Sequence, residues 1–112
     1  VGTDQAVTYV AGTNRTVEVP TTDNGIPVGI VTYQYGDKDG QTVAVQLDKV
    51  ADLVAAEVIS AGDDIIVGAG GKAKKASGLT AGTKAHVIGE AQNNAAIGEK
   101  VQILIVKKTY TV

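Results

Sequence analysis

Short runs of Val and Ile separated by glycine dominate this sequence, and they restrict the chain to β structure. The 112 residues include 17 Val, 9 Ile and 14 Gly, with no Phe, Trp or Met. β-branched side chains pack well on a pleated sheet and lose rotamer freedom in a helix. Glycine between such runs is typical of turns. The sequence therefore predicts an all-β fold, a small β-barrel or β-sandwich of short antiparallel strands with at most one short helix.

The length predicts a single domain that spans residues 1–112. Aliphatic side chains of this size each bury little area, so we expect an isolated monomer to be only modestly stable. Burial against a partner would supply further stability.

Alternating or apolar runs mark the expected strands. These runs lie at 7–10, 16–19, 28–35, 42–47, 64–67, 72–76, 85–91 and 100–106, and the tail 109–112 alternates again. The run 100–106 is apolar on both faces, which predicts a covered central strand. Residues 48–58 are the one candidate helix, with Asp48 as its cap, although residues 57–59 also fit a strand.

A tight hairpin turn is expected at Thr22-Asp23-Asn24-Gly25, because Asn-Gly tolerates positive φ angles. Residues 40–47 also resemble residues 98–105, with their apolar positions in phase. Each of these segments follows a strand that contains a glycine, Gly29 or Gly89. Two interpretations remain open, a duplicated hairpin or a common hairpin pattern that recurs by chance.

The stretch from Gly68 to Ala73 matches the dinucleotide fingerprint G-x-G-x-x-G/A. In such a site a helix begins at the glycines, and its N-terminus faces the phosphates. Residues 72–78 offer no apolar helix face, and further glycines interrupt any continuation. The phosphate-loop pattern fails too, because Ala73 follows Lys72 where Ser or Thr is required. We therefore interpret this loop as a turn between two strands.

The remaining polar candidates indicate structural roles. His86 is the only histidine, which leaves no histidine pair for a metal and no clear Ser-His-Asp array. The segment from Asp37 to Gly40 lacks the further ligands of a calcium loop. Asp63 and Asp64 are adjacent and would point to opposite faces of a strand, which is wrong for an acid–base pair. The sequence predicts a non-enzymatic protein without cofactor or metal.

Charge and composition exclude several classes of partner. The net charge of −2 and the pI near 5.2 argue against a nucleic-acid surface. The chain has no Cys, which excludes disulfides and thiolate metal sites. No apolar run approaches the roughly 20 residues of a membrane-spanning helix. The polar start without Met is not typical of a signal peptide, and we expect that an initiator residue or a leader was removed.

The second half of the chain carries an ordered set of motifs. It begins with Ala61-Gly62-Asp63 before an apolar strand, and Gly70-Gly71-Lys72 with Lys75-Ala76 follows. Next come Val87-Ile88-Gly89-Glu90-Ala91 and Ala96-x-Gly98-Glu99-x-Val101-x-Ile103. This order, over residues 57–106, resembles the capsid decoration (cement) proteins of tailed bacteriophages. Residues 1–47 match more loosely, and residues 107–112 depart from the pattern.

The resemblance implies a structural virion protein, made in the host cytoplasm, that binds the outer surface of a phage head. Its partner would be the major capsid protein, whose lattice it would stabilise, and it would form a homotrimer at three-fold positions. Many copies on a symmetric shell make weak single contacts effective. From charge, hydropathy and the polar residues above, we expect no cofactor, no nucleic-acid partner and no membrane partner.

The N-terminal stretch, residues 1–15, is the candidate capsid-contacting arm or edge strand. It is polar and punctuated by glycine, and it could become ordered on binding. Its candidate contact residues are Tyr9, Val10 and Arg15, with the first two as apolar anchors. The other interpretation assigns Tyr9 and Val10 to the first core strand.

Two other classes of function remain open. One is a subunit of another assembly, such as a tail tube or a surface layer, for which long edge strands would be typical. The other is a small carrier module like biotinyl or lipoyl domains, modified on Lys72 after the glycine turn. The sequence around Lys72 lacks the Met-Lys-Met or Asp-Lys-Ala setting of those domains.

Overall fold

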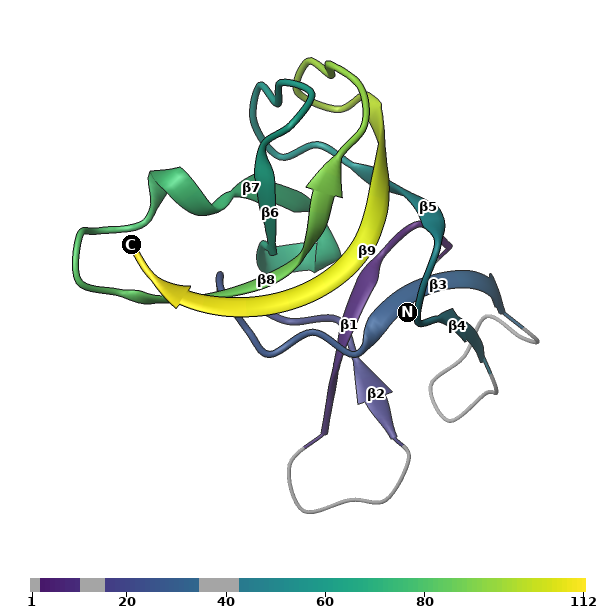
Figure 1. Cartoon of the computed structure of the whole chain (residues 1–112). Helices are drawn as coiled ribbons and strands as arrows, with labels where there is room; N and C mark the ends of the chain where they lie inside the picture. Colours follow the sequence, from purple (N-terminus) through teal and green to yellow (C-terminus); the bar gives the residue numbers. More distant parts are fainter. Residues whose placement is uncertain (1–2, 11–15, 35–42) are drawn as a thin grey trace.

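A computed structural model describes residues 3–10, 16–34 and 43–112, and it consists of two antiparallel sheets (Figure 1). The first sheet has the order β2-β1-β3-β4, with β1 (Ala6–Tyr9), β2 (Val17–Glu18), β3 (Gly29–Gln34) and β4 (Val43–Gln46). The second has the order β5-β9-β8-β6-β7, with β5 (Val50–Val54), β6 (Asp64–Val67), β7 (Ala73–Lys75), β8 (Lys84–Ala91) and β9 (Lys100–Thr111). Two 3₁₀ turns, η1 (Ala69–Gly71) and η2 (Ala76–Gly78), follow β6 and β7.

The two sheets pack on one apolar core, which confirms the all-β prediction in its sandwich form. Ala6 and Ile30 of the first sheet share this core with Leu53, Ile65 and Ile103 of the second, and all five are completely buried. A smaller cluster around Val7 and Val31 fills the other face of the first sheet. Within the described residues, neither η1 nor η2 is long enough to cross a membrane.

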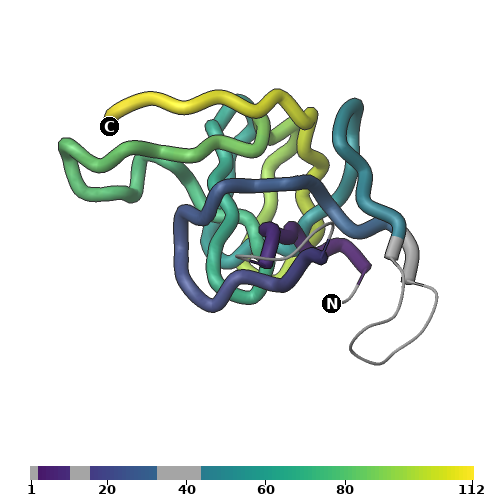
Figure 2. The backbone as a smooth tube through the Cα atoms, turned by 90° about the horizontal axis from the view of Figure 1, so that it is seen from below, coloured from purple at the N-terminus to yellow at the C-terminus, as the bar shows by residue number. Residues whose placement is uncertain are grey.

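Toward the C-terminus, β8 and β9 extend together beyond the packed sheets (Figures 1 and 2). A third cluster covers this part of the hairpin, where Ala85 and Val87 pack with Ile66 and Ala76. Leu79 and Val112 pack against the cluster from its rim. The runs predicted at 100–106 and 109–112 are thus one continuous strand, β9.

The prediction of a helix at 48–58 is wrong, because residues 50–54 form strand β5. This strand pairs with β9 from Val50 opposite Leu104 to Val54 opposite Lys100. Ala51 and Leu53 are buried while their neighbours in the strand are not, which is the two-residue period of a strand. The hydrogen-bonded ladder with a distant segment outweighs the weak helical spacing.

The prediction that residues 100–106 form a strand covered on both faces is also wrong. Val101, Ile103 and Ile105 are buried against the first sheet. Leu104 and Val106 lie on the outer face, where 38% and 54% of their surfaces are exposed. The face of β9 that carries Leu104 and Val106 is therefore exposed to solvent.

The expected hairpin turn at residues 22–25 has the predicted backbone but a different role. Asn24 has a positive φ of 68°. However, β2 and β3 do not pair with each other, since β1 lies between them. The Asn24 side chain instead contacts β8, where Nδ2 donates to the Lys84 oxygen at 2.7 Å and Oδ1 accepts from the His86 N–H at 2.8 Å. The turn therefore joins the two sheets.

Four strands of each sheet form structurally equivalent units, here called the first unit (β1–β4) and the second unit (β6–β9). The strand order β2-β1-β3-β4 has the counterpart β7-β6-β8-β9. The registers also agree, since Ile30 faces Gln46 in one unit and Glu90 faces Leu104 in the other. For the described part of residues 40–47, the sequence similarity to residues 98–105 therefore coincides with a structural repeat.

Backbone hydrogen bonds ahead of each first strand repeat as well. The Asp4 N–H donates to the Val31 oxygen, and the Gly62 N–H donates to the Ala91 oxygen, both at 2.8 Å. Asp4 and Gly62 both have positive φ angles, 61° and 91°. Within the described ranges, β5 has no counterpart in the first unit, and it adds one strand to the second sheet.

The two units differ in the polarity of one face. Ala6 faces Ile30 in the first unit, and this apolar pair is buried in the shared core. The equivalent pair in the second unit is Asp64 and Glu90, of which Glu90 is exposed. The face of the first unit that carries Ala6 and Ile30 is therefore buried, while the equivalent face of the second unit, which carries the acidic pair, is in contact with water.

Candidate functional site

A groove of about 390 Å³ lies in the first unit beside the predicted contact residue Tyr9. One side is formed by β1 and β2, which pair through Thr8–Glu18 and Tyr9–Val17. The residues between β2 and β3 form the other side. The complete lining comprises Thr8, Tyr9, Glu18, Pro20, Thr21, Thr22, Gly25 and Ile26.

Two large apolar side chains at this groove are exposed to solvent. Tyr9 at the end of β1 has 62% of its surface exposed, and Ile26 has 70% exposed. A Cβ built on Gly25 would lie 3.1 Å from Cγ2 of Thr8, so the glycine lets the two sides of the groove approach closely. Because Gly25 has no side chain, the connection that carries Ile26 can lie close to Thr8 of β1.

The lining combines apolar and polar groups. Tyr9, Pro20 and Ile26 provide apolar surface, while the threonine hydroxyls and the Glu18 carboxylate provide hydrogen-bonding groups. A Tyr side chain offers a large rigid area together with a polar hydroxyl, which is typical of protein interfaces. This chemistry fits an apolar side chain of a partner protein surrounded by polar contacts.

The three predicted contact residues are placed differently. Tyr9 ends β1 and points into solvent at the groove. Val10 is half-buried, and its N–H donates to the Thr16 oxygen at 2.9 Å, which closes the β1–β2 hairpin. Arg15 lies outside the described residues. Ile26 was missed by the sequence analysis, although a lone Ile between Gly25 and Pro27 in a polar connection is a usable signal.

The glycine loop at residues 68–71 is a turn between the paired strands β6 and β7, as predicted. Each of its four backbone N–H groups donates to an acceptor within the protein. The Gly68 N–H donates to Lys72 O at 2.7 Å, and the Gly71 N–H donates to Gly68 O at 3.0 Å. The Gly70 N–H reaches Pro20 O at 2.8 Å. The Ala69 N–H donates to Oδ1 of Asp23 at 2.8 Å. The anion at this loop is thus a carboxylate of the chain itself.

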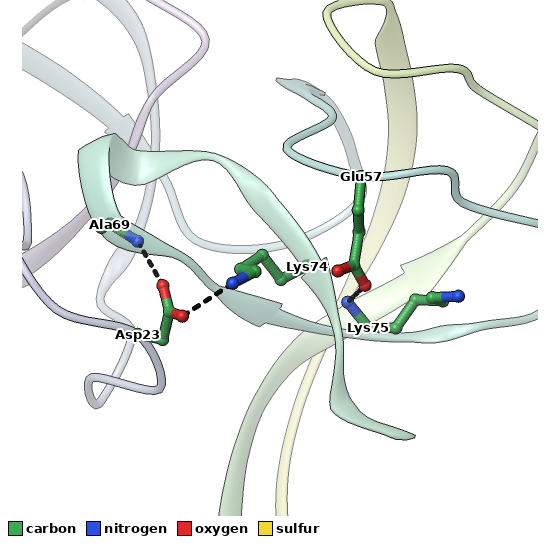
Figure 3. A network of polar contacts seen from close by, with 5 residues as sticks. All are labelled: Asp23, Glu57, Ala69, Lys74 and Lys75. Atoms are coloured by element: carbon green, nitrogen blue, oxygen red, sulfur yellow. Dashed lines mark hydrogen bonds and ion pairs between the residues drawn. The ribbon is translucent and has the colours of Figure 1, made fainter. Parts of the chain in front are cut away.

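Asp23 also pairs with Lys74 at 2.7 Å, and this contact ties the β2–β3 connection to β7 (Figure 3). The hydrogen bond from Lys74, followed by that from the Ala69 N–H, lowers the pKa of Asp23. The same bond to Asp23 raises the pKa of Lys74. Beside this pair, Oε1 of Glu57 accepts a hydrogen bond from the Lys75 N–H at 3.0 Å. The Lys74 side chain therefore serves structure as well as surface charge.

The remaining polar candidates also have structural contacts. Asp63 closes a turn by accepting from the Ser60 N–H at 2.9 Å. Asp64 accepts from the Tyr110 hydroxyl at 2.9 Å and pairs with Lys108 at 3.0 Å. Burial, followed by the bond to Asp64, raises the pKa of Tyr110.

His86 lies half-buried in β8. Residues 37–40, which were considered as a calcium loop, lie outside the described residues. The described part of the chain holds no group of three or more His, Cys, Asp or Glu side chains that could bind a metal ion.

Comparison with solved structures finds the same fold in a phage head protein. The head fiber gp8.5 N base of bacteriophage phi29 matches with a TM-score of 0.68 at 22% sequence identity. The match covers 100% of this chain and 90% of that one. No family model matches the chain, and no curated protein does.

The match extends over both units, including β5, because it spans the whole chain. At 22% identity it establishes the fold. The strand arrangement described above therefore also occurs in a head fiber protein.

Proposed function

We propose that this chain is a non-enzymatic structural protein of a phage virion that attaches to the outer surface of the head. The observation that carries this proposal is the whole-length fold match to a phage head fiber base. The resemblance of residues 57–106 to capsid decoration proteins leads to the same class of protein independently. Both relationships concern proteins of phage heads.

In this proposal the groove beside Tyr9 binds the major capsid protein. Tyr9 and Ile26 are large apolar side chains that are exposed in the lining of the same groove. Burying them against a partner would remove apolar surface from water, which is the main favourable term in most protein association. Val10, next to the end of β1, and Arg15 are the other two residues proposed for the contact.

The proposed assembly is a homotrimer at three-fold positions of the shell, which stabilises the lattice and needs no cofactor. Three linked chains bind the shell at several sites at once, so contacts that are weak individually give a high overall affinity. The light aliphatic core is consistent with a protein that gains stability from its partner.

The test of this site is the binding of purified variants to heads that lack the chain. Tyr9→Ser and Ile26→Ser each lower the affinity about tenfold, as expected for a central apolar contact. Ile97→Ser is the matched control, because Ile97 is 69% exposed in the loop between β8 and β9, outside the groove. If the control weakens binding as much as the two groove variants, the groove is not the contact.

Two further measurements separate the other classes of function. A tail-tube or surface-layer subunit would polymerise by itself and sediment without heads. A carrier module would show added mass on Lys72, which is exposed beside η1. Our proposal requires an intact mass equal to that of the unmodified chain.

A further inference from the structure

The repeat leaves one sheet edge occupied in the second unit and open in the first. In the second unit, β5 pairs antiparallel with the outer edge of β9. The equivalent strand of the first unit is β4, which ends its sheet. Among the described residues, no backbone hydrogen bond is made to the outer edge of β4.

The packing of β5 shows what the equivalent edge of β4 can accept. Ala51 of β5 lies opposite Ile103 and is buried in the shared core. The residue of the first unit equivalent to Ile103 is Val45, which is only half-buried at the rim of the cluster around Val7 and Val31. A strand added beside β4 would place a side chain next to Val45, as β5 places Ala51 next to Ile103.

The chemistry of β4 favours strand addition. Its sequence, Val43–Gln46, carries no charge and no proline, two of the devices that protect an edge strand. By contrast, the edge strand β7 at the far end of the second sheet carries Lys74 and Lys75. Leu47, directly after β4, is 57% exposed and extends the apolar surface at this edge.

We propose that the outer edge of β4 binds an extended segment of the head-shell protein, antiparallel to β4 and with aliphatic residues at alternate positions. This inference rests on the proposed function. Backbone hydrogen bonds would give affinity, and the side chains facing Val45 and Leu47 would give specificity. β4 lies two strands from β1, about 10 Å across the sheet, and Tyr9 is three residues, about another 10 Å, beyond the register of Gln46, so an extended segment of one partner can reach both.

A second copy of this chain fits the edge less well than a segment of a larger partner. β4 has four residues and is therefore about 14 Å long. Pairing two such strands buries far less than the roughly 800 Å² per partner of a stable interface. A segment that is also held at the groove does not need a large area at β4 alone.

The test uses the absence of Cys in the chain, which makes a single introduced thiol unique. Ala44→Cys places it on β4, and Ser77→Cys on η2 is the exposed control in the second unit. Each variant is labelled with a benzophenone maleimide, bound to heads that lack the chain, irradiated and analysed by mass spectrometry. We expect the label on residue 44 to cross-link to the shell protein and the label on residue 77 to cross-link far less.

The other outcomes overturn the proposal in distinguishable ways. A cross-link from residue 44 to a second copy of this chain assigns the edge to self-association. A variant that binds heads without cross-linking leaves the proposed function standing and removes strand addition. An unlabelled chain that does not bind heads removes both.

A second variant tests the edge without a label. Ala44→Lys introduces the charge that protects natural edge strands, and we expect affinity for heads to fall about tenfold. Ser77→Lys serves as its control, and thermal unfolding of both variants shows whether the fold is retained. Unchanged affinity of a folded Ala44→Lys variant contradicts the proposal.

Discussion

Gly29 and Gly89 occupy equivalent positions in the two units, each against the backbone of the neighbouring strand. A Cβ built on Gly29 would lie 2.2 Å from the Gln46 oxygen, and one built on Gly89 would lie 2.2 Å from the Leu104 oxygen. Each would also lie 2.8 Å from a β-branched side chain, Val45 or Ile103. The close approach of strands β3–β4 and β8–β9 is thus a shared requirement of the repeat.

We predict that Gly29→Ala and Gly89→Ala each lower the free energy of unfolding by about 2–4 kcal/mol. The clash is with backbone, which cannot move without disturbing the ladder. Gly78→Ala is the control, because the nearest atom to its Cβ would be a flexible Glu57 oxygen at 4.0 Å. Denaturant unfolding measures all three. A loss within about 0.5 kcal/mol at either repeat position would contradict the equivalence.

Asp23 should contribute stability that depends on pH. Its bond to Lys74, followed by the bond from Ala69, lowers the folded-state pKa below the ordinary 3.8. The contribution is therefore fully present above pH 3.8 and is lost as pH falls through the folded-state pKa. Because 41% of the Asp23 side chain is exposed, we expect Asp23→Asn to cost about 1 kcal/mol or less at neutral pH.

The measurement is the difference in unfolding free energy between wild type and Asp23→Asn from pH 7 to pH 2. The difference should shrink in acid. Lys74→Met removes the partner charge and should reduce the neutral-pH cost of Asp23→Asn. A difference that stays constant down to pH 2 would show that the ion pair is not its cause.

Asn24 should hold the first half of β8 in place. Asn24→Ala removes both hydrogen bonds to β8, and we expect a loss of about 1–2 kcal/mol and faster amide exchange at His86. Asn24→Gly keeps the positive φ without strain and isolates the side-chain effect. Equal exchange rates at His86 in wild type and Asn24→Gly would refute this role.

Tyr110 should titrate above its ordinary pKa of 10.0, because burial and its bond to Asp64 favour the neutral phenol. A pKa raised in the folded state adds stability below pH 10, and this stability is lost as pH rises through the folded value. Ultraviolet titration of wild type and Asp64→Asn, with the tyrosine signals assigned by NMR, measures the shift. The Asp64→Asn variant should show a smaller one.

Local sequence pattern predicted most of the strands, because alternation and glycine punctuation are local properties. The run 64–67 coincides with β6, and the run 42–47 contains β4. The helix at 48–58 failed because the helical spacing of Val50, Leu53 and Val54 extends over too short a length, while the two-residue period of Ala51 and Leu53 fits a strand. Only the ladder with β9, half the chain away, decides between them.

Pairing between distant strands explains the other errors as well. The Asn-Gly turn was read as a hairpin, but β1 lies between β2 and β3. The outward exposure of Leu104 and Val106 depends on which face the first sheet covers. Of the candidate site, the sequence pattern predicted Tyr9. Ile26 has a local signal, but its place in the same groove as Tyr9 depends on the folded connection between β2 and β3.

The most direct test of a head-attached virion protein is density-gradient fractionation of the source lysate with mass spectrometry of each fraction. The proposal predicts that the chain sediments with the heads, in a constant ratio to the major capsid protein. Finding the chain only at the top of the gradient, with intact heads below it, would contradict it.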